Sequence, residues 1–223
     1  RLDRTMAGLG PPPADHAQIH DGIRAVLDGE VIDFGRLRFT VTGGKGPLGS
    51  DRLDSALTHI VTAVAHERPE AQGSVVTVPW VRNERAATAG LKTTSYADNR
   101  AVLEQVRQKG ADEALSSDTQ GRICEATTAN IVLGVGGRLV TPTLKTGCLG
   151  GVTRSLLIEW GLVEEQDVAF AELGTVTEML LSSSTRNLIP VARCDDHIYA
   201  SPGPLGAQAI EAFKQRAAEG IDP

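Results

Sequence analysis

The spacing of apolar residues along this chain alternates between the period of a helix and the period of a strand. Residues 11–30, "PPPADHAQIHDGIRAVLDGE", open with prolines and place four apolar side chains on one helical face: Ile19, Ile23, Val26 and Leu27. The first ten residues, "RLDRTMAGLG", are also typical of a helix. Strands are predicted in two further runs. Residues 35–44 alternate apolar and polar side chains and end in glycines, and residues 56–65 are rich in β-branched side chains.

The second part of the chain shows the same alternation. The segment "SVVTVPW" (74–80) predicts a strand. The segment "YADNRAVLEQVRQKG" (96–110) predicts a helix that ends at Lys109-Gly110. Residues 113–142 predict several strands joined by "TQG" and "GVGG" turns. The remaining elements are expected to be a helix in 150–161, a strand leading into a hydroxyl loop in 176–184, and a closing helix in 204–220.

A polar, proline-broken stretch, "HERPEAQG" (66–73), is the candidate linker between two domains, 1–70 and 71–223. Helices and strands alternate without a clean βαβ repeat. We therefore expect an α+β fold and not a doubly wound parallel sheet.

Composition narrows the class of protein. The 223 residues carry a net charge of −6, with 41% hydrophobic and 22% charged residues, which is ordinary for a globular protein and unlike a nucleic-acid-binding surface. No apolar run approaches the roughly 18 residues that a membrane span needs. The three cysteines are far apart and form no CxxC pair, so we expect a reduced compartment and no metal site. Because the chain starts without methionine, we expect its natural N-terminus to lie upstream.

Lys92 is the first residue with candidate chemistry. It lies in "AGLKTTSYADNR" (89–100), after an extended apolar stretch and among small and hydroxylated residues. A lysine amine can bind a carbonyl cofactor such as pyridoxal phosphate covalently. Such a cofactor also needs a carboxylate beside its pyridine nitrogen. Its phosphate needs backbone N–H groups, hydroxyls and a cation.

The sequence offers a candidate for each of these needs. Glu125 is a carboxylate among small residues, and the "LGGVT" turn puts Val152 and Thr153 at the start of a helix. The "SSST" run (182–185) provides hydroxyls, and Arg1 provides a cation. Taken singly, Lys92 is also compatible with a surface lysine, Glu125 with a solvent-facing strand residue, and the glycines and serines with an ordinary turn and loop.

Four motifs follow one another along the chain: "GLKTTSYADN", "CEATTANIVL", "CLGGVTRSLLIEWG" and "MLLSSSTRNLIPV". By these motifs and their order, the chain resembles the class IV aminotransferases, the fold-type IV enzymes that use pyridoxal 5'-phosphate. The resemblance implies a two-domain α+β enzyme whose small α/β domain is N-terminally incomplete here, followed by a larger β-rich domain that binds the cofactor. It also implies a cytoplasmic homodimer. The residues expected to bind the cofactor are the covalent Lys92, the pyridine partner Glu125 of an E-x-x-x-x-N pattern, and the phosphate ligands Arg1, Val152, Thr153 and Ser184.

Within this family, "AGLK" followed by a short polar run resembles the aminodeoxychorismate lyases, as does "GADEAL" (110–115). Branched-chain enzymes usually have a Gly-Gly-Asn-Tyr run at this point. D-amino-acid enzymes tend to carry an arginine where this chain has Gly43, although some lyases do so too. Arg82 and Arg85, and less strongly Lys45, are candidates for binding substrate carboxylates, against the alternative of solvated loop residues.

The sequence therefore predicts an enzyme that releases pyruvate from 4-amino-4-deoxychorismate to give 4-aminobenzoate for folate synthesis. A carboxylate-bearing small molecule would be its substrate, without nucleic acid or membrane as a partner. An aminotransferase acting on branched-chain or D-amino acids, or a non-catalytic cofactor-binding protein, are the alternatives.

Overall fold

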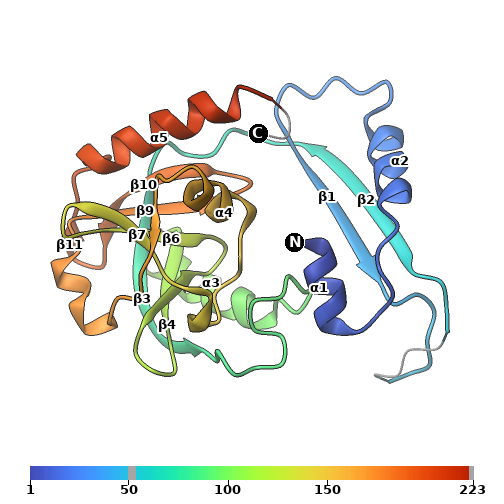
Figure 1. The fold of residues 1–223 in the computed structure, drawn as a ribbon, viewed down its shortest axis with the longest axis horizontal. Helices are drawn as coiled ribbons and strands as arrows, with labels where there is room; N and C mark the ends of the chain where they lie inside the picture. The colour runs from blue at the N-terminus through green and yellow to red at the C-terminus, as the bar shows by residue number, and fades with distance from the viewer. Residues whose placement is uncertain (50–53, 221–223) are drawn as a thin grey trace. The chain divides into compact units, whose positions relative to one another are not determined.

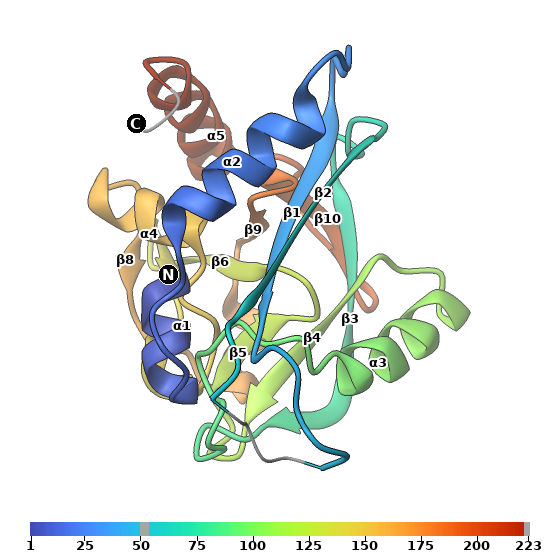
Figure 2. The same ribbon diagram turned by 90° about the vertical axis from the view of Figure 1, so that its right-hand side faces the viewer.

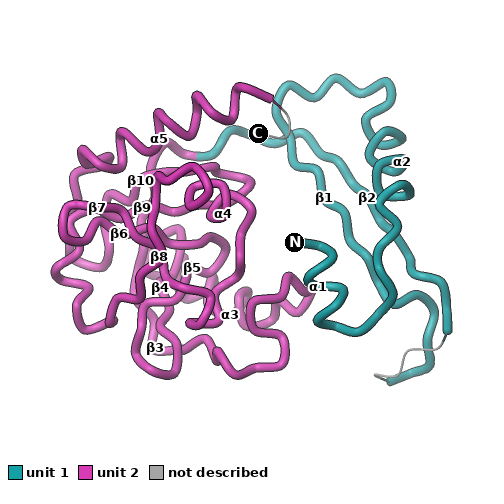
Figure 3. The backbone as a smooth tube through the Cα atoms, viewed as in Figure 1, with its two compact units in different colours: residues 1–69 teal, residues 70–223 magenta. Residues whose placement is uncertain are grey.

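A computed structural model describes residues 1–49 and 54–220 of the chain. The chain forms two compact units, Arg1–Pro69 (unit 1) and Glu70–Pro223 (unit 2), shown in Figure 3. The boundary taken from the sequence lies between residues 70 and 71. The mixed α+β class predicted from the sequence is confirmed, because both units combine helices with sheet.

Unit 1 is a two-stranded antiparallel sheet with a helix packed along it (Figure 2). Its elements are α1 (Leu2–Leu9), α2 (His16–Leu27), β1 (Gly35–Thr42) and β2 (Thr58–Ala65). Asp15 caps α2 by accepting a hydrogen bond from the Gln18 N–H at 3.1 Å. A Cβ on Gly22 would lie only 2.7 Å from Val61, so the missing side chain lets α2 approach β2 closely.

Unit 2 is built on a nine-stranded sheet (Figure 1). Eight of its strands follow the order β5-β4-β3-β10-β9-β6-β7-β8, and the ninth, β11, pairs with β10. Its strands are β3 (Gly73–Arg82), β4 (Glu113–Asp118), β5 (Ile123–Ala126), β6 (Asn130–Val135), β7 (Arg138–Thr141), β8 (Glu164–Glu165), β9 (Glu178–Ser183), β10 (Asn187–Cys194) and β11 (His197–Ile198). The "TQG" turn lies between β4 and β5, and the "GVGG" segment covers the turn between β6 and β7, as predicted.

Three α-helices complete unit 2: α3 (Ala97–Gln108), α4 (Val152–Glu159) and α5 (Pro204–Ala217). Two short 3-10 turns are η1 (Leu144–Thr146) and η2 (Phe170–Thr175). Strands β3 and β4 pair in parallel, with α3 as the crossover between them. The sequence showed no βαβ repeat. The sheet contains two parallel pairs joined through a helix, β3-α3-β4 and β7-α4-β8, and its other pairings are largely antiparallel.

Alternation along β6 places its side chains in two different buried clusters of unit 2. Ile131 and Leu133 of β6 face one buried cluster, while Val132 faces another that also contains Leu157 of α4 and Phe213 of α5. Because side chains alternate along a strand, Asn130 belongs to the same face of β6 as Val132, the face on which α4 packs. The pleat of β6 thus places a polar residue near the start of α4.

Strand β3 is irregular close to its end. Thr77 pairs with Leu115 and Val81 with Ser117, so four residue steps on β3 match two on β4. Pro79 lies inside this bulged stretch and has no N–H to donate to a neighbouring strand. A bulge bends and twists its strand, and this one lies directly before the end of β3 at Arg82.

Candidate active site

The segment that carries Lys92 links β3 to α3. The turn before it is closed by the Leu91 N–H, which donates to the Thr88 carbonyl at 3.1 Å, and Gly90 takes a positive φ of 72° that favours glycine. Lys92 is exposed, and its Nζ lies 5.1 Å from the centre of the Tyr96 ring. The positive charge of Lys92 also lowers the pKa of Glu125, so the two groups share one electrostatic environment.

Glu125 is a buried carboxylate, with 5% of its surface exposed, on the short strand β5. Its Oε1 accepts a hydrogen bond from Arg82 Nε at 2.9 Å and forms an ion pair with Arg82 Nη2 at 2.8 Å. Its Oε2 accepts from the Leu149 N–H at 2.9 Å and from Asn130 Nδ2 at 3.4 Å. Burial raises the pKa of Glu125, and the charge of Arg82 and the Leu149 N–H act against that rise.

Asn130 connects this carboxylate to the glycine turn before α4. Its Nδ2 donates to the Leu149 carbonyl at 2.7 Å as well as to Glu125. Gly151 is the N-cap of α4, and a Cβ on it would lie 2.2 Å from Asn130 Oδ1. Only glycine therefore fits beside Asn130, and the turn 149–151 is held against the carboxylate by main-chain and side-chain hydrogen bonds.

The N-terminus of α4 has the properties of an anion site. No side chain caps it, although its first residues Val152 and Thr153 carry two of the N–H groups that a helix leaves without intrahelical partners. The positive end of the helix dipole adds to the attraction for an anion. Thr153 is buried and Val152 is exposed.

Ser184 lies in the tight turn between β9 and β10 and is exposed. The turn is anchored at Arg186, whose guanidinium forms an ion pair with the fully buried Glu113 of β4 at 2.5 Å. Glu113 also accepts hydrogen bonds from the N–H and hydroxyl of Thr128, which lies between Glu125 and Asn130 in the sequence. One buried carboxylate thus ties the hydroxyl turn to the segment that carries Glu125.

The two arginines predicted to bind substrate lie in different surroundings. Arg82 is engaged with Glu125, with 40% of its side chain exposed. Arg85 is 82% exposed, and its Nε lies 3.8 Å from Glu84 Oε1. Glu84 is itself fixed by Thr119, whose hydroxyl donates to it at 2.7 Å, and this lowers the pKa of Glu84 to about 2. Arg85 is therefore the arginine of the two whose side chain extends into solvent.

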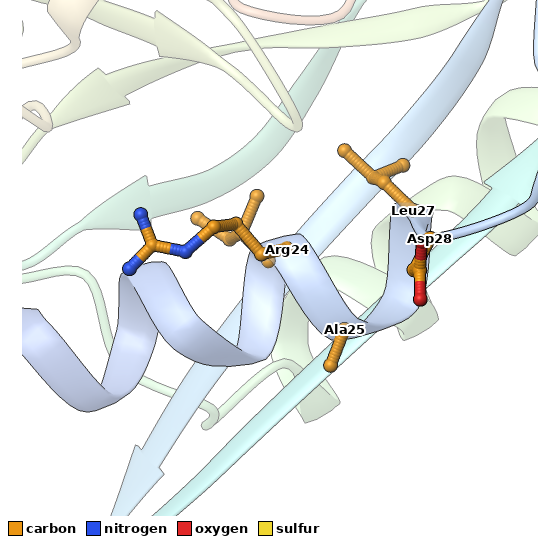
Figure 4. A pocket seen from close by; sticks show the side chains of 5 residues that line it. Arg24, Ala25, Leu27 and Asp28 are labelled. Carbon is orange, nitrogen blue, oxygen red and sulfur yellow. The ribbon is translucent and has the colours of Figure 1, made fainter.

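Two predicted residues, Arg1 and Lys45, belong to unit 1, as does Gly43, which stands where D-amino-acid enzymes tend to have an arginine. Arg1 precedes α1, and its carbonyl accepts a hydrogen bond from the Thr5 N–H at 3.1 Å. Gly43 and Lys45 follow β1 in an exposed loop. The roles of these residues toward the unit 2 groups stay predictions. The hollow beside α2, lined by Ile23, Arg24, Ala25, Leu27 and Asp28, contains none of the predicted site residues (Figure 4).

The residues of unit 2 fit the demands of pyridoxal phosphate. A lysine amine lies within the electrostatic range of a buried carboxylate, and a helix N-terminus without a side-chain cap lies in the turn hydrogen-bonded to that carboxylate. Lys92, Glu125, Val152 and Thr153 thus come from one connected part of unit 2. Among residues 1–49 and 54–220, no three His, Cys, Asp or Glu side chains are grouped so as to hold a metal. No helix in these ranges is long and apolar enough to cross a bilayer.

Asn130 was missed as a site residue, although the E-x-x-x-x-N spacing contained it. The feature of the sequence that could have identified it is an amide side chain at the first position of an apolar strand, because a buried amide needs hydrogen-bond partners. Tyr96, whose ring lies beside the Lys92 amine, was also missed. Its signal was an aromatic residue four positions after the lysine, at the start of a helix.

Comparisons with known proteins identify the family of this chain. The model of the family described as amino-transferase class IV matches residues 1–194. A candidate branched-chain-amino-acid aminotransferase of Thermotoga maritima is 35% identical over 101 residues, 42% of this chain and 37% of that protein. The match therefore spans little more than a third of that relative. The D-alanine aminotransferase of Bacillus licheniformis is 27% identical over 216 residues, 92% of this chain and 76% of its own length.

Solved structures share the fold. A candidate 4-amino-4-deoxychorismate lyase from Legionella pneumophila has a TM-score of 0.87 and 22% identity, over 96% of this chain and 82% of its own. At this identity the likeness concerns the fold alone.

Proposed function

This chain belongs to the class IV aminotransferase family, whose cofactor is pyridoxal 5'-phosphate, and from that premise we propose that it is an aminodeoxychorismate lyase. The reaction releases pyruvate from 4-amino-4-deoxychorismate and leaves 4-aminobenzoate. The substrate is a small carboxylate-bearing molecule. We propose that the active form is a homodimer, as the resemblance to the family implies.

The observation that carries the proposal is the segment around Lys92. The lysine follows the Gly90 turn, and a hydroxyl run comes directly after it, where the Ser95 N–H donates to Thr93 Oγ1 at 3.3 Å. This polar turn replaces the Gly-Gly-Asn-Tyr run usual in branched-chain enzymes. In unit 1, Gly43 offers no side-chain cation where D-amino-acid enzymes tend to place one.

The proposed roles are those that the resemblance to the family implies for these residues. Lys92 holds the cofactor covalently, and Glu125 accepts a hydrogen bond from its pyridine nitrogen. The N–H groups of Val152 and Thr153, the Ser184 hydroxyl and Arg1 bind its phosphate. Arg85, which extends into solvent, is available for a substrate carboxylate.

When bound, the cofactor supplies an electron sink for bond cleavage beside the substrate amine. Once released from the cofactor, Lys92 Nζ would take a proton from the ring carbon that bears the amine and would give it to the methylene carbon of the departing enolpyruvate. One proton moves and one C–O bond breaks, so no second substrate is needed. Formation of the aromatic ring makes the cleavage favourable.

An aminotransferase is the second candidate, and it is favoured by both relatives named above, which are described as aminotransferases. It would use the same Lys92 and Glu125 but would pass its nitrogen to a keto acid. The two functions therefore differ in whether the reaction needs an amino-group acceptor.

The test is to incubate the cofactor-loaded protein with 4-amino-4-deoxychorismate and to measure pyruvate and 4-aminobenzoate. We expect both products in equal amounts without any added keto acid. Incubation with D-alanine or leucine should leave the cofactor spectrum largely unchanged. Rapid stoichiometric conversion of the cofactor to its amine form by either amino acid, with no pyruvate from aminodeoxychorismate, would identify an aminotransferase. No turnover in any assay would favour a cofactor-binding protein.

A further inference from the structure

Arg82 directs two N–H groups at a single oxygen of a buried carboxylate. Its Nε and Nη2 lie 2.9 Å and 2.8 Å from Glu125 Oε1, while the Leu149 N–H and Asn130 Nδ2 serve Oε2. Four donors thus surround a side chain that is 5% exposed. Charge-assisted hydrogen bonds of this kind favour a carboxylate anion and fix the plane of the carboxylate.

The fold brings Arg82 to Glu125 across strand β4. Arg82 is the last residue of β3 and pairs with Asp118 of β4, whereas Glu125 of β5 pairs with Ser116 of β4. The bulge of β3 between Thr77 and Val81 shifts the strand end relative to β4 and turns it. The ion pair is therefore produced by the sheet, since the two residues are 43 positions apart in the sequence.

The charge of Arg82 opposes the rise in the pKa of Glu125 that burial causes. Burial raises the pKa of Glu125, and the charge of Arg82 is the strongest influence that lowers it. The Leu149 N–H and the charge of Lys92, from the segment before α3, also lower the pKa of Glu125, and the thiols of Cys124 and Cys148 feel the charge of Glu125 in turn. Burial raises the pKa values of both thiols, so they remain uncharged at neutral pH. Arg82 is thus the closest compensating charge.

We propose that Arg82 is a positioning residue that holds the Glu125 carboxylate as an anion in a fixed orientation, and that it does not serve mainly as a substrate-binding residue. The inference deepens the proposed function and rests on it for the identity of the group that Glu125 faces. The anion is needed there because only an ionised carboxylate can accept a hydrogen bond from a protonated pyridine nitrogen with full charge complementarity.

The first test is a double-mutant cycle on the full chain, with Arg82→Gln, Glu125→Gln and the double variant. Urea unfolding is measured from pH 5 to pH 8. Removing the arginine raises the folded-state pKa of Glu125 further above its unfolded value. The variant therefore loses stability relative to the parent as pH rises past the parent's Glu125 pKa. We expect the ratio of unfolding constants, R82Q over parent, to rise by about tenfold or more, because one pKa unit corresponds to tenfold.

The Glu125→Gln background is the matched control. There the Arg82→Gln substitution should show no such rise with pH, because no carboxyl remains to titrate. A pH-independent loss, or the same rise in both backgrounds, would overturn the proposal. If Arg82→Gln alone fails to fold, folding of the double variant would support the inference. Failure of the double variant as well would contradict it.

The second test separates positioning from substrate binding in the cofactor-loaded enzyme. Arg82→Gln should lower kcat by about tenfold or more and change KM by less than about threefold, and Arg82→Lys should recover part of kcat. A raised KM with unchanged kcat would show that Arg82 binds the substrate, and would overturn the proposal. If the chain binds no pyridoxal phosphate, the proposed function fails, whereas the unfolding cycle still decides the role of Arg82.

Discussion

At the scale of single residues, the proposed chemistry depends most on Lys92. Its side chain is exposed and contacts the Tyr96 ring, so its removal should cost little packing. We expect Lys92→Ala to keep the fold and to lose several orders of magnitude of activity, as when a covalent catalyst is removed. Borohydride treatment should no longer attach the cofactor to residue 92, which mass spectrometry of the digested protein would show.

Lys214→Ala is the matched control, because Lys214 is an exposed lysine on α5 with no proposed role. It should behave as the parent does in both measurements. Activity of Lys92→Ala within about tenfold of the parent, which is only about 1.4 kcal/mol in the barrier, would mean that another group does the chemistry.

Residue types and their order were enough to select Lys92 and Glu125 as candidates, because a covalent amine and a pyridine partner must each be one kind of side chain. The sequence could not show that Arg82 would contact Glu125. That contact depends on the bulge of β3 and on the pairing of β3 and β5 with opposite edges of β4. Likewise, the hydrogen bond from Asn130 to Leu149 joins residues 19 positions apart, through packing of α4 on the sheet.

At the scale of elements, the junction between the glycine turn and α4 should be intolerant of any side chain. A methyl group on Gly151 would lie 2.2 Å from Asn130 Oδ1 and would push the amide away from Glu125 and Leu149. We expect Gly151→Ala to lower the free energy of unfolding by about 1–3 kcal/mol. It should also weaken pyridoxal phosphate binding by about tenfold, roughly 1.4 kcal/mol, because the N–H groups of α4 would shift. Urea unfolding and fluorescence titration measure the two effects.

Gly174→Ala is the control, since a Cβ there meets no atom within 4 Å and its φ is not in the left-handed region. It should leave both quantities close to the parent values. If Gly151→Ala bound the cofactor as tightly as Gly174→Ala, the turn before α4 would not be part of the binding site.

Long periodic elements were predictable, whereas β10 and the shortest strands were not. The patterns of 11–30 and 96–110 identified α2 and α3 because each has a continuous apolar face. Strand β10 was missed because Pro190 lies within it, and a proline argues against a strand interior. The two-residue strands β8 and β11 carry no period that a sequence could display.

At the scale of the whole molecule, local patterns predicted the α+β class but could not give the order of the sheet. The parallel pairing of β3 with β10 joins Gly73 to Val191, and it places the first strand of unit 2 beside one of its last. Such a pairing is decided by which apolar faces bury each other, as in the cluster that contains Val75 and Val191. No single segment of the sequence carries that information.

The two units bury very different amounts of apolar surface, and this should appear in their dynamics. The cluster of unit 1 has three buried members, Met6, Ala14 and Ile19, under a two-stranded sheet, whereas β6 and β9 lie in the interior of a nine-stranded one. Two-stranded sheets with little core open at low cost. We expect amide hydrogens in β1 and β2 to exchange about a hundredfold faster than those in β6 and β9, which is roughly 2.8 kcal/mol in opening free energy.

Hydrogen–deuterium exchange followed by mass spectrometry of peptides from each strand would measure this difference in the full chain. The comparison uses only the amides of β1 and β2 that are hydrogen-bonded to the partner strand, because alternate N–H groups of a two-stranded antiparallel sheet point away from it. For those amides, unequal burial is the remaining cause. Equal protection of β1 and β6 would mean that unit 1 is stabilised by something other than its own core, such as a second copy of the chain. A protein concentration series in the same experiment would reveal such a contact as protection of β1 and β2 that increases with concentration.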